Sequence, residues 1–166
     1  CINGFCFRLS NVYGGSNILY SANRGVINKV INRALTNKTI TLFGDGNYLR
    51  DYIHIDDVVN CINHSINLSE KLLGKHVLLC KGKSHTINEV WNLIAKLIEE
   101  LYSIKITVKK KKWPNNYLEI EKRNFVADNA LLVDNLGIEP KRDLKESLKE
   151  NIKMIYKNLE KEIVIQ

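Results

Sequence analysis

The stretch of sequence with the clearest chemical potential is GDGNYLRDYIHIDD, residues 44–57, where a glycine-rich turn precedes a cation and several carboxylates. Arg50 stands at the start of an alternating aromatic and aliphatic run that predicts a buried strand. A guanidinium offers forked donors that match phosphate oxygens, and it stays charged at any working pH. The alternative role is a structural ion pair with Asp51 or Asp57. From these residues alone, both roles stay open.

Histidine and cysteine spacing gives no support for a metal site. The four histidines and four cysteines form neither a CxxC pair nor a paired histidine pattern, so no zinc ligand is predicted. Three cysteines lie in apolar stretches, where a free thiol behaves as a small core residue: Cys6, Cys61 and Cys80. We therefore expect a reducing, cytoplasmic setting.

The composition is that of an ordinary soluble domain, with 45% hydrophobic and 26% charged residues among 166. No apolar run approaches the roughly 18 to 20 residues of a membrane span, so no membrane partner is predicted. The net charge of +7 raises the alternative of a basic nucleic-acid-binding domain. The basic residues are scattered, however, and the run Lys109–Lys112 is short and has no nucleic-acid-binding motif beside it. A basic surface also suits a doubly anionic small substrate.

Strand and helix patterns alternate along the chain, which predicts an α/β fold. Strands are expected at 5–9, 39–43, 50–55, 76–80 and 104–108, the first of them buried. Helices are expected at 25–36, from Asp56 or Asp57 as the cap to residue 65, from a capping box at Thr86–Glu89, from Asp128 to Gly137, and from a second box at Asp143–Glu146. The segments 10–17 and 109–123 are expected as loops. Because the chain opens in a predicted buried strand, we expect it to be the back portion of a longer protein.

Four segments at these spacings resemble a known family: FRLSNVYG at 7–14, GVINKVINRAL at 25–35, ITLFGDGNYLRDYIHIDDVVNCI at 40–62, and the tail from residue 126. The series is similar to the back half of an NAD-dependent nucleotide-sugar epimerase/dehydratase, an extended short-chain dehydrogenase/reductase. The resemblance implies the last strands of a Rossmann-like parallel sheet plus a small α/β substrate-binding lobe. Residues 1–166 would then be the C-terminal part, with the N-terminal coenzyme-binding part absent.

Two catalytic motifs of that family do not occur in this sequence. The family carries a GxxGxxG loop that cradles the dinucleotide pyrophosphate, and a Tyr-x-x-x-Lys pair that supplies a base. None of the nine glycines or seven tyrosines falls in such a pattern. We therefore expect no catalytic residue and no activity in this chain alone. By resemblance, the longer parent protein is expected to bind NAD as its cofactor and to form a homodimer. This part alone is not expected to bind NAD well.

The resemblance assigns the substrate diphosphate to Arg50 and to the side-chain amide of Asn11, and it favours the phosphate role over the ion pair. Asn11 could equally hold a turn. Asp51 is expected to orient the local backbone. Many relatives complete the clamp with an arginine before a proline, where this chain has Lys112, Trp113 and Pro114. Lys112 or Arg123 is the expected substitute, although a lysine lacks the fork and the lysine run could be a solvated loop.

The remaining predicted contacts also follow from the resemblance. The helix start at Gly25 and Val26 borders the nucleotide. Leu42 and Phe43 frame the nucleobase, mainly through backbone groups. Leu9 and Ser10 lie beside the nicotinamide ring of the cofactor.

The sequence thus predicts the nucleotide-sugar-binding portion of a sugar epimerase or dehydratase, for example one like UDP-glucose 4-epimerase. Its partner would be a nucleotide-diphosphate sugar, and nucleic acid is not favoured. A non-catalytic nucleotide-sugar-binding module and a basic nucleic-acid-binding domain stay as alternatives. The sugar, the base and the reaction stay open.

Overall fold

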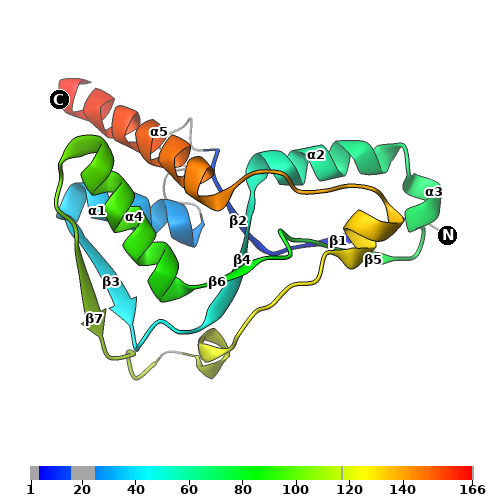
Figure 1. Cartoon of the computed structure of the whole chain (residues 1–166), viewed down its shortest axis with the longest axis horizontal. Coiled ribbons are helices and arrows are strands. Elements are labelled where there is room, and N and C mark those ends of the chain that lie inside the picture. Colours follow the sequence, from blue (N-terminus) through cyan, green and yellow to red (C-terminus); the bar gives the residue numbers. More distant parts are fainter. Residues whose placement is uncertain (1–3, 16–24, 117, 166) are drawn as a thin grey trace.

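The computed structural model describes residues 4–15, 25–116 and 118–165, and it has an α/β fold (Figure 1). The strands are β1 (Cys6–Leu9), β2 (Asn11–Tyr13), β3 (Thr39–Phe43), β4 (Leu49–His54), β5 (His76–Leu79), β6 (Ser84–Thr86) and β7 (Thr107–Lys111). The helices are α1 (Val26–Asn37), α2 (Ile55–Ile66), α3 (Ser69–Leu72), α4 (Ile87–Tyr102) and α5 (Leu144–Ile165), with short turns η2 (Glu119–Lys122) and η3 (Leu131–Asn135). Among the described helices, none has the length and apolar character needed to cross a bilayer.

Most strand pairs are parallel. β1 pairs with β5, β2 with β4, and β3 with β7, while β6 joins β4 antiparallel. Parallel neighbours cannot be joined by a tight hairpin, so helices lie between the paired strands along the chain. The register of β2 on β4 sets Asn11 opposite Tyr52, close to Arg50.

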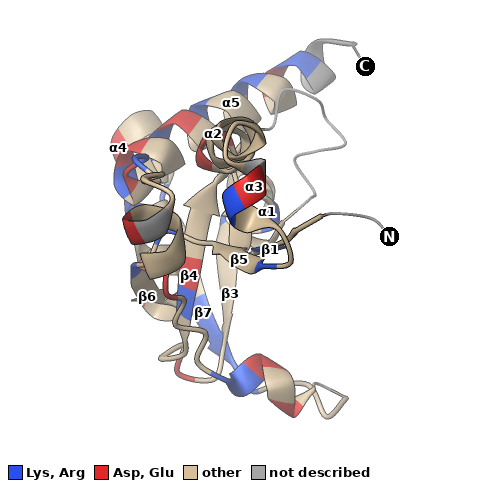
Figure 2. Ribbon diagram, turned by 90° about the vertical axis from the view of Figure 1, so that its right-hand side faces the viewer, with Lys and Arg blue, Asp and Glu red and all other residues tan. Residues whose placement is uncertain are grey.

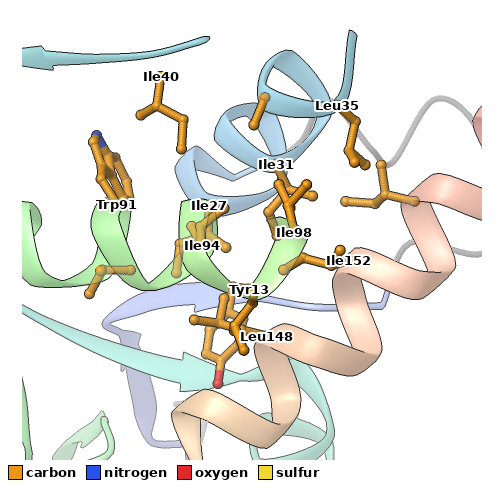
Figure 3. Close-up of a cluster of buried hydrophobic side chains, with 14 of the residues drawn as sticks. Tyr13, Ile27, Ile31, Leu35, Ile40, Trp91, Ile94, Ile98, Leu148 and Ile152 are labelled. Atoms are coloured by element: carbon orange, nitrogen blue, oxygen red, sulfur yellow. The ribbon is translucent and has the colours of Figure 1, made fainter. Parts of the chain in front are cut away.

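The larger of two apolar cores lies where α1, α4 and α5 meet β3. Figure 3 shows Ile27 and Ile31 of α1 beside Ile94 and Ile98 of α4, with Leu148 of α5 close to them. All of these side chains are at most 1% exposed. The smaller core lies between the β1–β5 pair, α2 and η3. The helices bury the faces that the apolar spacing predicts.

Two helix starts show how the chain fixes its ends. At α4, Thr86 Oγ1 accepts from Glu89 N at 3.1 Å and Glu89 Oε2 accepts from Thr86 N at 2.8 Å, which confirms the predicted capping box. At α2, the cap is His54, whose Nδ1 accepts from Asp56 N at 3.2 Å. The prediction that Asp56 or Asp57 caps α2 is wrong, because the cap is His54 and the helix begins at Ile55, earlier than expected.

The first strand is correctly located, but its predicted burial is wrong. β1 is mostly exposed, and the exposed part includes Cys6 and Leu9. Alternation along the strand turns Phe5 and Phe7 toward the smaller core and Cys6 and Arg8 away from it. Among the described strands, β1 pairs with β5 alone. The apolar residues predicted a strand, but they did not reveal that only one of its two faces is covered.

Two short strands lie where the sequence predicted loops, or nothing regular. β2 forms within the expected loop at 10–17, and β6 precedes α4. The strand expected at 104–108 runs instead from Thr107 to Lys111, so it ends three residues inside the expected long loop at 109–123. Figure 2 shows β7 carrying basic residues alongside β3.

Candidate functional site

Arg50 is held by backbone carbonyls of a distant segment. Its Nη2 donates to Glu121 O at 2.7 Å, and its Nη1 donates to Leu49 O at 2.9 Å and to Arg123 O. The same segment is joined to β4 by Phe125 N, which donates to Leu49 O at 2.9 Å. Because several carbonyls fix the guanidinium, its position is set before any ligand arrives.

Asp51 does not pair with Arg50. Its side chain is fully buried. Oδ1 accepts from Ser10 Oγ at 2.8 Å and Lys81 N at 3.0 Å, and Oδ2 accepts from Gly82 N at 2.8 Å and Lys83 N at 3.2 Å. These donors satisfy the carboxylate without a cation. The contacts agree with the expectation that Asp51 orients local backbone, and they leave the charge of Arg50 uncompensated by this neighbour.

Asn11 is fixed beside Arg50 by β2–β4 pairing and by its own amide. Its Nδ2 donates to Asp51 O at 2.8 Å. Asn11 and Arg50 line the same two cavities, one of about 650 Å³ and one of about 350 Å³. Glu121 also lines both. These three residues therefore mark the boundary between the cavities.

The larger cavity is basic. Lys29 and Arg33 reach it from one face of α1, and Arg50 and Lys111 reach it from β4 and β7. Glu121 is the one acidic residue among its described lining residues. Such an excess of cations in a concave site favours an anionic ligand.

The larger cavity also has an aromatic wall. The rings of Phe43 and Trp113 stack with centroids 5.4 Å apart and planes 24° from parallel. Tyr52 lines the cavity too, and burial raises the pKa of its phenol to about 12, so it stays neutral. The site therefore combines flat apolar surface with positive charge.

The predicted site residues are only partly brought together. Asn11, Val26, Phe43 and Arg50 line the larger cavity. The smaller cavity is lined by Leu9, Ser10 and Arg123 in addition to Asn11 and Arg50.

Three predicted residues line neither cavity. Leu42 is 1% exposed because strand alternation turns it into the larger core, which leaves only its backbone for a ligand. Gly25 is the N-cap of α1, with φ of 74°. Lys112 is exposed, while its neighbours Lys111 and Trp113 face the cavity.

Sequence reasoning missed several lining residues. Lys29 and Arg33 are four apart on a predicted helix whose start was already assigned to the site, so helical spacing could have found them. Glu121 and Trp113 come from the irregular segment after β7. Contacts far apart in the sequence place that segment, and no local pattern reveals them.

The two residues predicted to lie beside the nicotinamide ring, mainly through their backbone, are Leu9 and Ser10, and both line the smaller cavity. Ser10 already donates its hydroxyl to Asp51, and Leu9 is an apolar side chain that is 53% exposed. A dinucleotide pyrophosphate needs a glycine-rich loop at a helix start, and the sequence has no GxxGxxG. Among the described residues, no group of three or more His, Cys, Asp or Glu side chains gathers as a metal site would require.

Comparisons with known proteins relate this chain to nucleotide-sugar epimerases and similar enzymes. The sequence model of the NAD dependent epimerase/dehydratase family matches residues 2–80. A "Putative UDP-glucose 4-epimerase" of Methanocaldococcus jannaschii is 28% identical over 155 residues, 91% of this chain and 45% of that protein. A "Probable GDP-L-fucose synthase 1" of Oryza sativa is 26% identical over 90% of this chain and 44% of its own length.

Solved structures show the same fold. The crystal structure of UDP-glucose 4-epimerase with UDP-glucose from Thermotoga maritima has a TM-score of 0.77 and 27% identity, covering 95% of this chain and 47% of that one. A dTDP-glucose 4,6-dehydratase from Bacillus anthracis, in complex with NAD, has a TM-score of 0.72 at 22% identity, which shows the fold alone.

These matches show that the chain is similar to members of the NAD-dependent epimerase/dehydratase family and has a partial Rossmann-like α/β fold. The chain spans less than half the length of the relatives named above. The family match covers residues 2–80, the first half of this chain. It therefore does not support the finer expectation of a C-terminal half of such an enzyme.

Proposed function

We propose that this chain is the nucleotide-sugar-binding portion of an NAD-dependent sugar epimerase or dehydratase. The observation that carries the proposal is the placement of Arg50 and Asn11 together at the boundary of two cavities. A ligand with a diphosphate in its middle and bulky groups at both ends fits such a boundary. The nucleoside would occupy the larger cavity and the sugar the smaller one.

Arg50 would bind the diphosphate with little reorganisation. The carbonyls of Leu49 and Glu121 hold the guanidinium in place, and the carboxylate of Asp51 is occupied elsewhere. Charged hydrogen bonds to phosphate are strong, and a pre-positioned cation loses little conformational entropy on binding. Asn11 would add a neutral contact from the neighbouring strand.

Relatives support this ligand class. The Thermotoga maritima epimerase is described in complex with UDP-glucose. For this chain, binding of a nucleotide sugar is the proposal, and turnover would need the coenzyme site and the Tyr-x-x-x-Lys pair, which its sequence does not contain.

Isothermal titration of the 166-residue chain with UDP-glucose and dTDP-glucose tests the proposal, with free glucose as the ligand control. Arg50→Ala should weaken nucleotide-sugar binding by about 10- to 100-fold, the expected effect of losing charged hydrogen bonds. Arg50→Lys keeps the charge without the fork and should fall in between.

The matched control is Arg8→Ala, because Arg8 is an exposed arginine that lines neither cavity. Its affinity should equal that of the wild type. If the wild type binds no nucleotide sugar, or if Arg50→Ala and Arg8→Ala bind alike, the proposed function is overturned.

A further inference from the structure

The indole ring of Trp113 packs against two other aromatic rings at the edge of the larger cavity. Its ring stacks on Phe43, with ring centroids 5.4 Å apart. It also makes a T-shaped contact with Tyr48, with ring centroids 6.2 Å apart and ring planes 63° from parallel. Trp113 and Phe43 are both half-buried and both line the cavity. Trp91 lines the same cavity but is only 6% exposed, so Trp113 and Phe43 offer it more ring surface.

The turn before β4 is shaped around this ring. Gly44 has φ of +66°, and a Cβ at this position would lie 2.7 Å from Trp113 Nε1. Gly44 N also donates to Lys111 O at 2.9 Å, which joins the turn to the end of β7. Because Gly44, the first glycine of GDG, has no side chain, the indole can pack closely against the turn. The turn and the ring therefore form one packed unit.

The cavity beside this unit suits a ligand that has both a flat apolar part and an anionic part. One wall is flat and aromatic, and cations approach from α1, β4 and β7. A free sugar phosphate would leave the aromatic wall unused, and an apolar ligand would leave the cations unpaired. A nucleotide satisfies both, because its base has two apolar faces and its phosphates are anionic.

We propose that the heteroaromatic base of the ligand stacks on the indole ring of Trp113. This ring, which packs against Phe43 and Gly44, is the base platform. This inference rests on the proposed function and deepens it by a division of roles: the platform recognises the base of the ligand, while Arg50 recognises its phosphates. Stacking depends on the aromatic face and tolerates different bases. Trp113 therefore selects for the presence of a base and not for its identity.

Two variants of the 166-residue chain test the division of roles, each titrated calorimetrically with UDP and with inorganic diphosphate. Trp113→Leu should weaken UDP binding by about 5- to 100-fold, the range for losing one base–aromatic stack, and should leave diphosphate binding unchanged. Trp113→Phe keeps an aromatic face and should recover most of the UDP affinity. Arg50→Ala should weaken both ligands.

Fluorescence gives a direct readout of the same contact. The chain has two tryptophans, Trp91 and Trp113. Because both line the cavity, the emission of Trp113 is recorded in a Trp91→Phe background, where UDP should quench it and inorganic diphosphate should not. Circular dichroism checks that each variant is folded. If Trp113→Leu is not folded, quenching of Trp113 by UDP in the Trp91→Phe background serves as the test, and the absence of quenching on UDP binding overturns the stacking role.

The outcomes separate the inference from the proposed function. If Arg50→Ala weakens UDP while both Trp113 variants bind it like the wild type, the base platform is overturned and the diphosphate site stands. If the wild type binds neither UDP nor diphosphate, the proposed function is overturned, and the platform with it. Equal losses of UDP and diphosphate affinity in Trp113→Leu would overturn the stacking role.

Discussion

Asp51 accepts a hydrogen bond from the hydroxyl of Ser10 at 2.8 Å, a contact that joins the end of β1 to β4 next to Arg50. The other donors to this carboxylate are backbone N–H groups of residues 81–83. One buried acid thus fixes two strand ends and a loop at once. Arg50 itself is held by the backbone carbonyls of Leu49, Glu121 and Arg123, and Asp51 makes no contact with its charge.

We predict that Asp51→Asn destabilises the fold by about 1–3 kcal/mol, the usual result of leaving a buried group unsatisfied. An amide keeps the shape but turns two donor hydrogens toward the backbone N–H groups of Gly82 and Lys83, which are donors themselves. Urea unfolding measures the change. Asp134→Asn is the control, because Asp134 is exposed. Equal midpoints for the two variants would contradict the prediction.

His54 makes the stability of the fold depend on pH. Burial lowers the pKa of its imidazole from its ordinary value of 6.5, against the weaker opposing effect of Asp56. Its Nδ1 accepts from Asp56 N at 3.2 Å and lies 3.4 Å from Asp56 Oδ2, and it cannot be a cap acceptor and a cation at once. The lowered pKa favours the neutral acceptor.

The sign of the pH effect follows from proton binding. The unfolded chain protonates His54 at a higher pH than the folded chain does, so stability is complete above about pH 6.5 and is lost as the pH falls through the folded pKa. We predict that His54→Asn, which keeps a capping acceptor, flattens the decline of the unfolding free energy between about pH 7 and 5. His76→Asn, at an exposed position, should leave that decline intact. Parallel curves for wild type and His54→Asn would rule out this source.

The cysteines should differ sharply in reactivity. Burial raises the pKa of the Cys61 thiol to about 11 and that of Cys80 to about 12, so neither is a thiolate near neutral pH. Cys6 is exposed on β1. We predict rapid labelling of Cys6 by iodoacetamide in the folded chain, with Cys61 and Cys80 labelled only after unfolding, as mass spectrometry of the peptides would show. Prompt labelling of Cys80 in the native chain would contradict its burial.

The sequence predicted those parts of the fold that local pattern determines. β3 has its predicted bounds, Thr39–Phe43, and the capping box at Thr86 is present atom for atom. Alternation and capping depend on residues a few positions apart, so the letters contain the information. β2 and β6 have three residues each, too few for a period to appear.

The candidate site was less predictable because distant segments build it. The carbonyls that hold Arg50 come from Glu121 and Arg123, more than 70 positions along the chain. The exposure of Cys6 was missed for a related reason, since its apolar neighbours do not say which face of β1 is covered. The family resemblance favoured a phosphate role for Arg50, which stays a prediction, but only tertiary contacts bring Trp113 and Glu121 to the same cavity.

Gly44 and Gly74 offer a matched pair for testing the seat of Trp113. Both have positive φ, +66° and +70°, but a Cβ on Gly74 would meet nothing within 4 Å, whereas one on Gly44 would meet Trp113 Nε1 at 2.7 Å. Gly74→Ala should lose only the left-handed backbone term, about 1–2 kcal/mol. We predict that Gly44→Ala loses more and shifts the emission of Trp113, recorded in a Trp91→Phe background. Equal losses of unfolding free energy, with unchanged emission in both variants, would show that the indole does not depend on the bare α-carbon of Gly44.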